Sequence, residues 1–529
     1  MDRQAGRISP SGGACGAKGK IRRLAAAMQE VRMDQIKYNS TRGGESGISA
    51  SRAILEGISK DGGLFMPDHF PALDKSLREL ADMDYRGVAY EVMKLFLTDY
   101  TEEELKNCIN SAYDEKFDTP EIAPLVYADG VYYLELFHGR TIAFKDMALS
   151  ILPHLMTTAA KKNGVTNEIV ILTATSGDTG KAAMAGFADV PGTRIIVFYP
   201  KGGVSHVQEL QMLTQKGDNT YVVGETGNFD DAQTGVKKIF GDRAFADRLA
   251  KAGFQLSSAN SINIGRLIPQ VVYYVYAYTR LLGTHRIMPG EKVNFTVPTG
   301  NFGNILAAYF AKRIGVPVNR LICASNDNKV LYDFFQTGTY DRNREFILTT
   351  SPSMDILISS NLERLIYLAC GEDAEETRKL MAELAETGKY TVTPEMRERM
   401  KDFIGGYATQ EENAAEIRRL FEAMHYLIDT HTGVASCVYH AYRENTGDKT
   451  VTVISSTASP YKFASSVMSA IRGDGEKKKD DFALIDEMER VSGVSIPPAI
   501  REIRNAEIRH HHTCAPAEME NMVAELLGL

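Results

Sequence analysis

Glu135-Leu-Phe-His-Gly-Arg-Thr-Ile-Ala-Phe-Lys-Asp146 is the stretch from which the fold can be predicted. It follows an apolar run, Val131–Leu134, that is typical of a strand. Apolar residues then recur at the spacing of an amphipathic helix, at Met147, Ile151 and Leu155. Lys145 therefore lies where a strand and a loop lead into a helix, with Phe144 beside it to exclude water. Desolvation lets a lysine lose its proton and act as a Schiff-base amine, although a lone lysine in a first helical turn is usually solvated.

Two further strand–loop–helix junctions are rich in glycine and hydroxyl residues. Glu168–Gly180 ends in Thr-Ala-Thr-Ser-Gly-Asp-Thr-Gly, and Val293–Asn304 ends in Pro-Thr-Gly-Asn-Phe-Gly-Asn. Glycines let the backbone approach a ligand, and the helix start that follows offers free N–H groups and a positive dipole end. Such turns are also ordinary in α/β proteins. Beside a candidate Schiff-base lysine, the pair indicates one anion site for a cofactor phosphate and one for a substrate acid.

Nucleotide-binding motifs do not fit either junction. A P-loop ending at Gly180-Lys181 would need glycine at position 175 and Ser or Thr at position 182, where the chain has Thr175 and Ala182. Neither junction has the Gly-x-Gly-x-x-Gly order of a dinucleotide site. These two kinds of nucleotide site are therefore excluded.

Taken together, these segments resemble threonine synthases, which are fold type II enzymes dependent on pyridoxal 5′-phosphate. The resemblance extends over nearly the whole chain from Met33 onward, with its blocks in the expected order, and it is to the longer class with an N-terminal segment and an insertion. The blocks are Tyr38–Gly43, His138–Asp146, Thr173–Gly180, Tyr199–Ser205, Ser258–Arg266, Pro298–Asn304 and Ser456–Pro460.

The resemblance implies roles for the residues around the cofactor. Lys145 would form the Schiff base, and the loop that holds the cofactor phosphate would consist of Gly300, Asn301, Phe302 and Asn304. Thr457 matches the hydroxyl residue that faces the pyridine nitrogen. A hydroxyl does not protonate that nitrogen as an aspartate would, so the electron sink is weaker and transamination is suppressed.

The resemblance also assigns the substrate side of the site. The loop with Ser176, Asp178 and Thr179 is expected to cradle the substrate carboxylate, with Asp178 near the cofactor's 3′-oxygen. Asn263 and Arg266 are the candidates for the substrate phosphate, because arginine binds phosphate bidentately. Ser459 stands where many relatives have histidine. No metal site is expected.

The function that follows is the conversion of O-phospho-L-homoserine and water to L-threonine and phosphate, the last step of threonine biosynthesis. Lys145 would act as the general base on the α-hydrogen and then move a β-proton. Two alternatives remain open. A serine/threonine dehydratase of the same fold would need no phosphate-binding arginine near Asn263, and a phospho-lyase-like relative would keep Lys145 but lose threonine formation.

The expected fold is α/β: a fold type II, tryptophan synthase β-like enzyme with two parallel-sheet domains and a helical N-terminal segment. Residues 33–128 would form that segment, with helix starts at Ser76 and Thr101. Residues 129–290 would form the α/β domain with the lysine. Residues 291–529 would form the second α/β domain, with the phosphate loop and a helical insertion at about 370–430. Strands are expected near residues 131, 168, 194, 221, 293, 320 and 450.

Composition limits the remaining possibilities. The 529 residues have a net charge of −8, which argues against a nucleic-acid surface, and the apolar stretch 267–282 is expected to be a buried helix rather than a membrane span. Six scattered cysteines indicate reduced thiols, as in a cytoplasmic enzyme. Either a monomer or a homodimer is expected. Residues 1–32 are basic and lack a secretory signal, so a disordered or dispensable tail is favoured over an organelle transit peptide.

Overall fold

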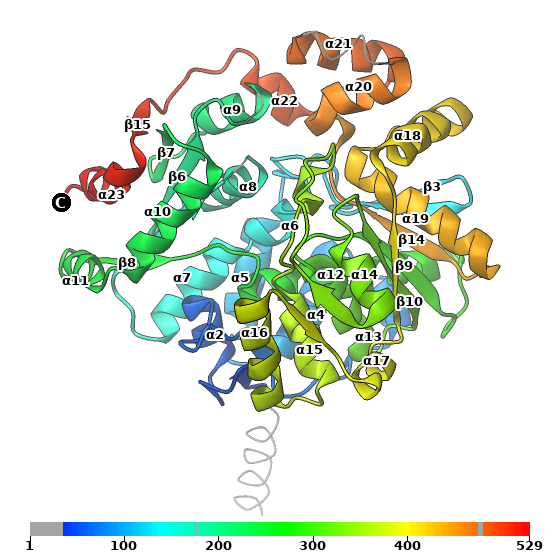
Figure 1. Cartoon of the computed structure of the whole chain (residues 1–529), viewed down its shortest axis with the longest axis horizontal. Helices are drawn as coiled ribbons and strands as arrows, with labels where there is room; N and C mark the ends of the chain where they lie inside the picture. The colour runs from blue at the N-terminus through cyan, green and yellow to red at the C-terminus, as the bar shows by residue number, and fades with distance from the viewer. Residues whose placement is uncertain (1–34, 176, 205, 474–479) are drawn as a thin grey trace, which may run out of the picture.

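A computed structural model describes residues 35–175, 177–204, 206–473 and 480–529. The predicted tail, residues 1–32, and Ser176 lie outside the described residues. Two separate β-sheets organise the chain, each with helices packed against it (Figure 1). The larger has six strands in the order β13-β10-β9-β14-β4-β3, parallel except for β3. Its strands are β3 Leu125–Ala128, β4 Val131–Glu135, β9 Val293–Pro298, β10 Val318–Ser325, β13 Phe403–Tyr407 and β14 Thr452–Ser456.

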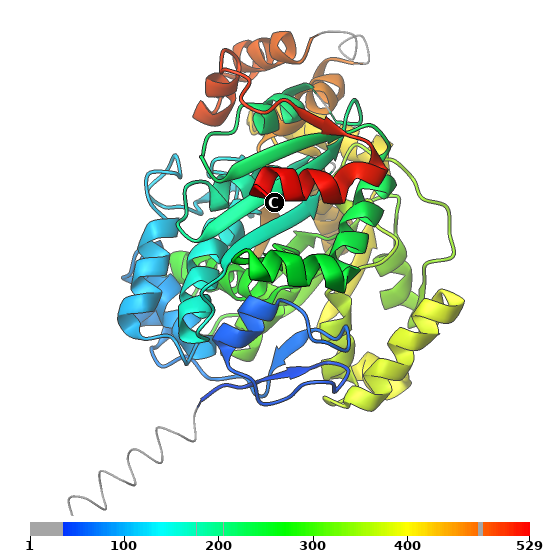
Figure 2. The ribbon, with the colours of Figure 1, turned by 90° about the vertical axis from the view of Figure 1, so that its left-hand side faces the viewer.

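The smaller sheet has five parallel strands in the order β15-β7-β6-β5-β8. They are β5 Glu168–Ala174, β6 Thr193–Pro200, β7 Thr220–Glu225, β8 Phe254–Ser257 and β15 His512–Cys514. Figure 2 shows this sheet with the C-terminal helix α23 (Met519–Leu527) lying across it. Buried apolar residues fill both faces of its central strands, as parallel strands covered by helices require. All seven strands predicted from the sequence are present.

The sheets do not follow the predicted division of the chain at residue 290. Strand β4, expected with the other strands of 129–290, pairs with β14 in the six-stranded sheet. Strand β15, at the end of 291–529, pairs with β7 in the five-stranded sheet. The two sheets therefore each combine strands from both of the predicted ranges, 129–290 and 291–529. Apolar periodicity identifies a strand, but its sheet is decided by pairing with segments far away in the chain.

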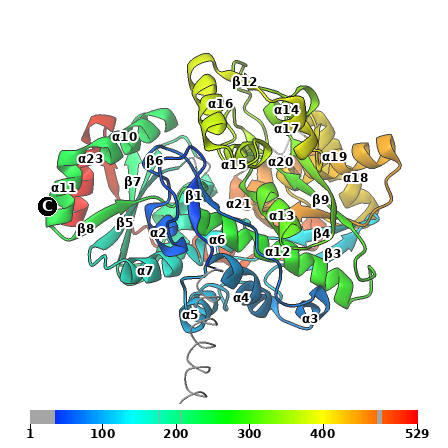
Figure 3. The same ribbon diagram turned by 90° about the horizontal axis from the view of Figure 1, so that it is seen from below.

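Helix α12, Ile264–Gly283, lies between the two sheets (Figure 3). Eighteen of its twenty residues are buried, which confirms the predicted buried helix; Gly283 and Arg280 are the others. It packs on α4 (Tyr85–Phe96), α6 (Asp146–Leu149) and α13 (Gly303–Arg313), and Arg266 lies in its first turn. No helix in the described ranges is both long and apolar enough to cross a membrane.

The N-terminal segment contains more helix than strand, although much of it is neither, and both predicted helix starts are correct. Ser76 and Thr101 cap α3 and α5, each with a capping box closed by a glutamate three residues later. The segment also holds a short antiparallel pair, β1 and β2. Its elements are β1 Tyr38–Ser40, α2 Ala50–Glu56, β2 Phe65–Pro67, α3 Leu77–Ala81, α4 Tyr85–Phe96 and α5 Glu102–Ala112.

The predicted insertion at 370–430 contains helices, but it is not wholly helical. Its strand β13 forms the outer edge of the six-stranded sheet, and β12 (Lys389–Thr391) pairs with β11 (Thr339–Asp341).

The helix expected after Lys145 is divided in two, with Pro153 in the first turn of the second part. The remaining helices are α6 Asp146–Leu149, α7 Leu152–Lys162, α8 Asp178–Phe187, α9 His206–Leu213, α10 Phe229–Gly241, α11 Arg243–Lys251, α13 Gly303–Arg313, α14 Val330–Thr337, α15 Leu362–Ala369, α16 Ala374–Thr387, α17 Pro394–Arg399, α18 Gln410–Met424, α19 Thr430–Thr446, α20 Ala464–Arg472, α21 Asp481–Ser492 and α22 Pro498–Ile503, with 3-10 turns η1 Pro352–Met354, η2 Pro460–Phe463 and η4 Pro516–Glu518.

Candidate active site

Lys145 lies directly before α6, at the carboxyl end of β4. The loop that carries it is held to the end of the neighbouring strand β14: the Phe144 N–H donates to the Thr457 carbonyl at 2.8 Å, and the Ser459 N–H donates to the Ile142 carbonyl at 3.0 Å. Thr457 itself is 5% exposed. The structure therefore brings the predicted lysine and the predicted hydroxyl residue together on one edge of the six-stranded sheet.

Asp178 reaches this edge from the other sheet. It is the first residue of α8, which follows β5, and its Oδ2 lies 3.6 Å from Lys145 Nζ. The turn before it is tight: Thr175 Oγ1 accepts from the N–H groups of Gly177 and Gly180, both at 3.0 Å. Gly177 has φ +136°, a conformation that favours glycine, and a Cβ there would lie 2.8 Å from the Gln208 side chain. The site thus lies between the two sheets.

Lys462 is the second cation paired with Asp178, and it was not predicted from the sequence. Its side chain is 2% exposed, and its Nζ lies 3.2 Å from Asp178 Oδ1 while donating to the Thr141 carbonyl at 3.0 Å. Ser353 Oγ donates to Asp178 Oδ2 at 3.0 Å. A lysine between Tyr461 and Phe463, five residues after Thr457, was the available signal. It was overlooked because a single lysine is usually solvated.

These charges are strongly coupled because water is excluded. Burial lowers the pKa of Lys145, the carboxylate of Asp178 opposes that effect, and the charges of Lys462 and Arg266 lower the pKa further. Burial raises the pKa of Asp178, but Lys462 and Lys145 outweigh it and hold that pKa well below its usual range. The site therefore contains an ionised carboxylate beside an amine that loses its proton more easily than an ordinary lysine.

The glycine-rich loop after β9 has the features of a phosphate cradle. Phe302 is left-handed, with φ +65°, directly before α13, so the loop ends at a helix N-terminus. Gly300 packs so closely that a Cβ would lie 2.5 Å from the Ser353 carbonyl. Ser359 Oγ donates to the Gly300 carbonyl at 2.6 Å, and Asn361 Nδ2 donates to the Asn301 carbonyl at 3.0 Å. These contacts hold the loop against the turn at Ser353 and against Ser359 and Asn361.

Asn304, in the first turn of α13, has an unused donor. Its Oδ1 accepts from the hydroxyls of Tyr273 at 2.7 Å and Tyr274 at 2.5 Å, whereas its buried Nδ2 has no partner in the described part of the chain. A buried donor without an acceptor is costly. A phosphate oxygen at the start of α13 would satisfy it, so these residues fit the phosphate of pyridoxal phosphate.

Arg266 is buried without an acidic partner among the described residues. It is 4% exposed, its Nη1 donates to the Ala259 carbonyl at 3.0 Å, and its Nε has no partner. Burial lowers the pKa of Arg266 to about 10, so the guanidinium remains charged at neutral pH. Asn263 is fully engaged elsewhere: its Oδ1 caps α12 by accepting from the Gly265 N–H at 2.8 Å, and its Nδ2 donates to the Ile54 carbonyl at 2.9 Å.

Two family models match the chain. The one described as threonine synthase N terminus matches residues 37–113, and the one described as pyridoxal-phosphate dependent enzyme matches residues 117–457. Threonine synthase of Saccharomyces cerevisiae is 34% identical over 516 residues, which cover 92% of this chain and 98% of the yeast protein. The chain belongs to the threonine synthase family. It is accordingly a pyridoxal-phosphate dependent enzyme, as the sequence indicated.

Solved structures of threonine synthases share the fold. The chain superposes on pyridoxal-phosphate-bound threonine synthase from Brucella melitensis with a TM-score of 0.83 at 34% identity, covering 94% of this chain and all of that one. For the yeast enzyme the TM-score is 0.84 at 32% identity, covering 94% and 99%. The fold type II prediction is thereby confirmed. Human threonine synthase-like 1 is 39% identical over 436 residues, which span 80% of this chain but 58% of the human protein.

A second residue near the site, His431, was also not predicted from the sequence. His431, at the start of α19, is 4% exposed; its Nδ1 lies 2.7 Å from Asp429 Oδ2, and its Nε2 accepts from the Ser353 N–H at 3.2 Å. His431 thereby holds the turn at Ser353, whose carbonyl packs on Gly300 and whose hydroxyl donates to Asp178.

Thr179, another predicted site residue, is partly buried in the first turn of α8.

Proposed function

We propose that the protein converts O-phospho-L-homoserine and water to L-threonine and inorganic phosphate, and is therefore a carbon–oxygen lyase acting on phosphate. The observation that carries this proposal is the excess of buried positive charge. Lys145 and Lys462 flank one carboxylate, Asp178, while Arg266 lies near enough to lower the pKa of Lys145 and its Nε has no partner in the described chain. A substrate with one phosphate and one carboxylate would balance these charges.

The cofactor would be held from two sides. The loop with Gly300, Asn301, Phe302 and Asn304 would bind its phosphate through the N-terminus of α13 and the free Nδ2 of Asn304. Thr457 would offer a neutral hydroxyl to the ring nitrogen, since it ends the strand beside the lysine loop. When bound, pyridoxal phosphate supplies the electron sink that stabilises negative charge developing on the substrate carbons.

Lys145 would move the protons. Its neutral amine, favoured by burial, would take the proton from Cα of the substrate, give that proton up, and then take the proton from Cβ. Departure of phosphate from Cγ is followed by protonation of Cγ, addition of water at Cβ, and return of a proton to Cα. The protons released from Cα, from Cβ and from the added water equal those taken up by Cγ, by Cα and by the departing phosphate. Each time Lys145 is protonated, the carboxylate of Asp178 at 3.6 Å stabilises the resulting ammonium. No net proton is gained by the protein.

The carboxylate and the phosphate of the substrate would bind at two different places in the site. Thr179, in the first turn of α8, would bind the carboxylate together with Ser176, because that helix begins beside Lys145. Arg266 would bind the phosphate with its free Nε. Asn263 would serve indirectly, by capping α12 and so fixing the turn that carries Arg266.

We also propose a cell compartment and an assembly state for the protein. The five described cysteines are free thiols, as expected in a reducing compartment, and we place the enzyme in the cytoplasm. A monomer or homodimer is consistent with a site formed within one chain. Gel filtration coupled to light scattering would separate these two states.

The decisive assay measures two products at once. The purified chain loaded with pyridoxal phosphate is incubated with O-phospho-L-homoserine, and phosphate and threonine are quantified. Equal amounts of the two support the proposal. Phosphate released with 2-oxobutyrate instead of threonine would identify a phospho-lyase-like relative, and turnover of serine or threonine alone would identify a dehydratase.

A further inference from the structure

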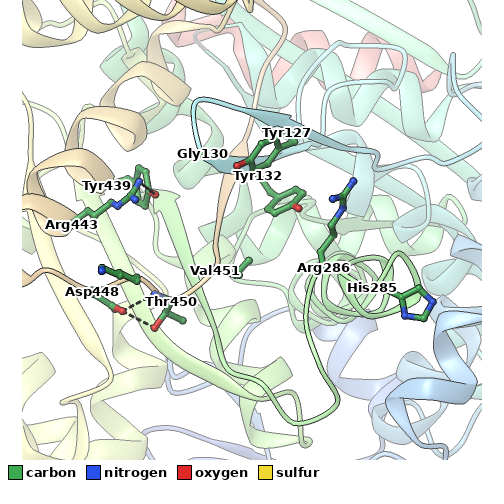
Figure 4. A pocket seen from close by; sticks show the side chains of 11 residues that line it. Tyr127, Gly130, Tyr132, His285, Arg286, Tyr439, Arg443, Asp448, Thr450 and Val451 are labelled. Carbon is green, nitrogen blue, oxygen red and sulfur yellow. Dashed lines mark hydrogen bonds between the residues drawn. The ribbon is translucent and has the colours of Figure 1, made fainter.

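A second pocket, of about 410 Å³, opens at the edge of the six-stranded sheet opposite the active site (Figure 4). It is formed by the β3–β4 hairpin, the residues after α12, the end of α19 and the turn that leads into β14. Strands β4 and β14 begin at this pocket and end at the segments that carry Lys145 and Thr457. With five residues per strand, the two sites are about 16 Å apart.

Three cationic side chains line the pocket without acidic partners. Arg443 and Arg286 enter from opposite sides, and Lys449 lies on the turn before β14. Within the described residues, Arg443 has one polar side-chain contact, to the Tyr439 hydroxyl at 3.3 Å, and neither Arg286 nor Lys449 has an ion pair. Like charges around one hollow repel each other, so the arrangement favours an anion between them.

Asp448 is the one acid in the lining, against three cations, and its hydrogen bonds are to neutral groups. Its Oδ1 accepts from the Thr450 N–H at 2.9 Å and from the Thr450 hydroxyl at 2.6 Å. Its Oδ2 accepts from Asn294 Nδ2 at 3.0 Å and from the Tyr442 hydroxyl at 2.8 Å. The nearby Asp129 is paired with Arg419 at 2.6 Å. The net charge facing the hollow is therefore positive.

Aromatic rings supply a second kind of surface. Tyr127 and Tyr132 are paired across the hairpin, with ring centroids 4.9 Å apart, and Tyr127 is 63% exposed. Tyr439 lines the pocket from α19 but is only 5% exposed, so the exposed ring is that of Tyr127 (Figure 4). Exposed tyrosine faces beside arginines bind planar rings by stacking, and a pocket of this volume matches a mononucleotide-sized ligand.

We propose that this pocket is a second ligand site, which binds a small phosphorylated molecule with a planar ring, such as a nucleoside monophosphate. The cations would bind its phosphate and the tyrosines its ring. Because the pocket lies at the opposite edge of the sheet, such a ligand would not compete with substrate. The proposal is independent of the reaction proposed above.

Isothermal titration calorimetry tests it with AMP on the full chain loaded with pyridoxal phosphate, so that the cofactor phosphate loop is already filled. We expect one AMP per chain, with adenosine and inorganic phosphate each binding at least tenfold more weakly. Arg286→Gln and Arg443→Gln should each weaken AMP at least tenfold. Both residues are on the surface, so the fold should be retained.

Two matched variants define the control. Arg86→Gln makes the same charge change on α4, where the Arg86 side chain is 49% exposed, and should leave AMP binding unchanged. Arg266→Gln should also leave it unchanged, whereas loss of AMP binding there would place the ligand in the active site and overturn the proposal. Three other results would overturn the proposal. AMP would show no saturable binding, or it would bind both pocket variants as tightly as the original protein, or inorganic phosphate would bind as tightly as AMP.

Discussion

Replacing Arg266 with methionine tests whether this arginine binds the substrate phosphate. Methionine keeps most of the side-chain volume and removes the charge, so no large cavity is left in the buried surroundings of α12. In the described structure the guanidinium makes one hydrogen bond, to the Ala259 carbonyl, and its Nε is unsatisfied. We therefore expect Arg266 to contribute more to the binding of an anion than to the stability of the folded chain.

Arg266→Met is expected to lower catalytic activity without lowering the stability of the fold. A charge-assisted hydrogen bond contributes about 1.5–3 kcal/mol, so Arg266→Met should lower kcat/KM for phosphohomoserine about 10- to 150-fold. Burial lowers the pKa of Arg266 from 12.5 to about 10, which corresponds to about 3 kcal/mol of destabilisation by the buried charge. The lost bond to Ala259 offsets about 1 kcal/mol of this. Without substrate, the variant should thus unfold at the same or a higher temperature.

Steady-state kinetics and thermal unfolding on the same preparation provide the assay, with cofactor content checked by absorbance. Arg266→Lys serves as the matched variant: it keeps the charge but cannot bind phosphate bidentately, so its kcat/KM should lie between the other two. Unchanged kcat/KM combined with a lower unfolding temperature would show that Arg266 is structural. Loss of cofactor, with activity restored by excess pyridoxal phosphate, would show that it binds the cofactor phosphate instead.

Three other substitutions test separate parts of the site. Lys462→Met removes the charge that lowers the pKa of Asp178, so that pKa should rise and the acid limb of the kcat/KM–pH profile should move to higher pH; an unmoved limb would separate Lys462 from catalysis. Asn304→Ala removes the buried donor, and dialysis should show cofactor retention at least tenfold weaker, with KM for substrate unchanged at saturating cofactor. Burial lowers the pKa of His138, but bonds to two carboxylates raise it to about 9. Its stabilisation is full below about pH 6.5 and lost as pH rises through 9, so His138→Gln should lower the unfolding temperature at pH 6 and not at pH 10.

The parts of the site that follow a strand could be predicted from the sequence. Lys145, the loop at Asp178 and the loop at Gly300 each come after an apolar run and before a helix, and the carboxyl ends of parallel strands carry such loops. The pattern also predicted seven strands and two helix caps correctly. It could not show that β4 and β5, consecutive in the chain, belong to different sheets, because their own residues do not encode their pairing partners.

Lys462 and His431 escaped prediction because their roles depend on contacts across the chain. Lys462 lies more than 280 residues after Asp178 in sequence, yet their side chains are 3.2 Å apart. His431 acts through Ser353, on the turn that meets Gly300. Neither follows a glycine-rich junction. A buried charge can be recognised only when its surroundings are known, since a lysine or histidine in isolation is usually solvated.

Asn263 and Arg266 show how one motif can contain two different kinds of residue. Both were predicted to bind the substrate phosphate from the resemblance to threonine synthases, because arginine binds phosphate bidentately. The structure uses both polar groups of Asn263 to cap α12 and to hold α2, whereas Arg266, one turn later, keeps a free donor. A cap fixes the first turn of a helix, and the first turn fixes where Arg266 points. We infer that Asn263 is a positioning residue. Asn263→Asp, which retains the cap acceptor, should therefore preserve more activity than Asn263→Ala, and equal losses in the two variants would return Asn263 to the phosphate site.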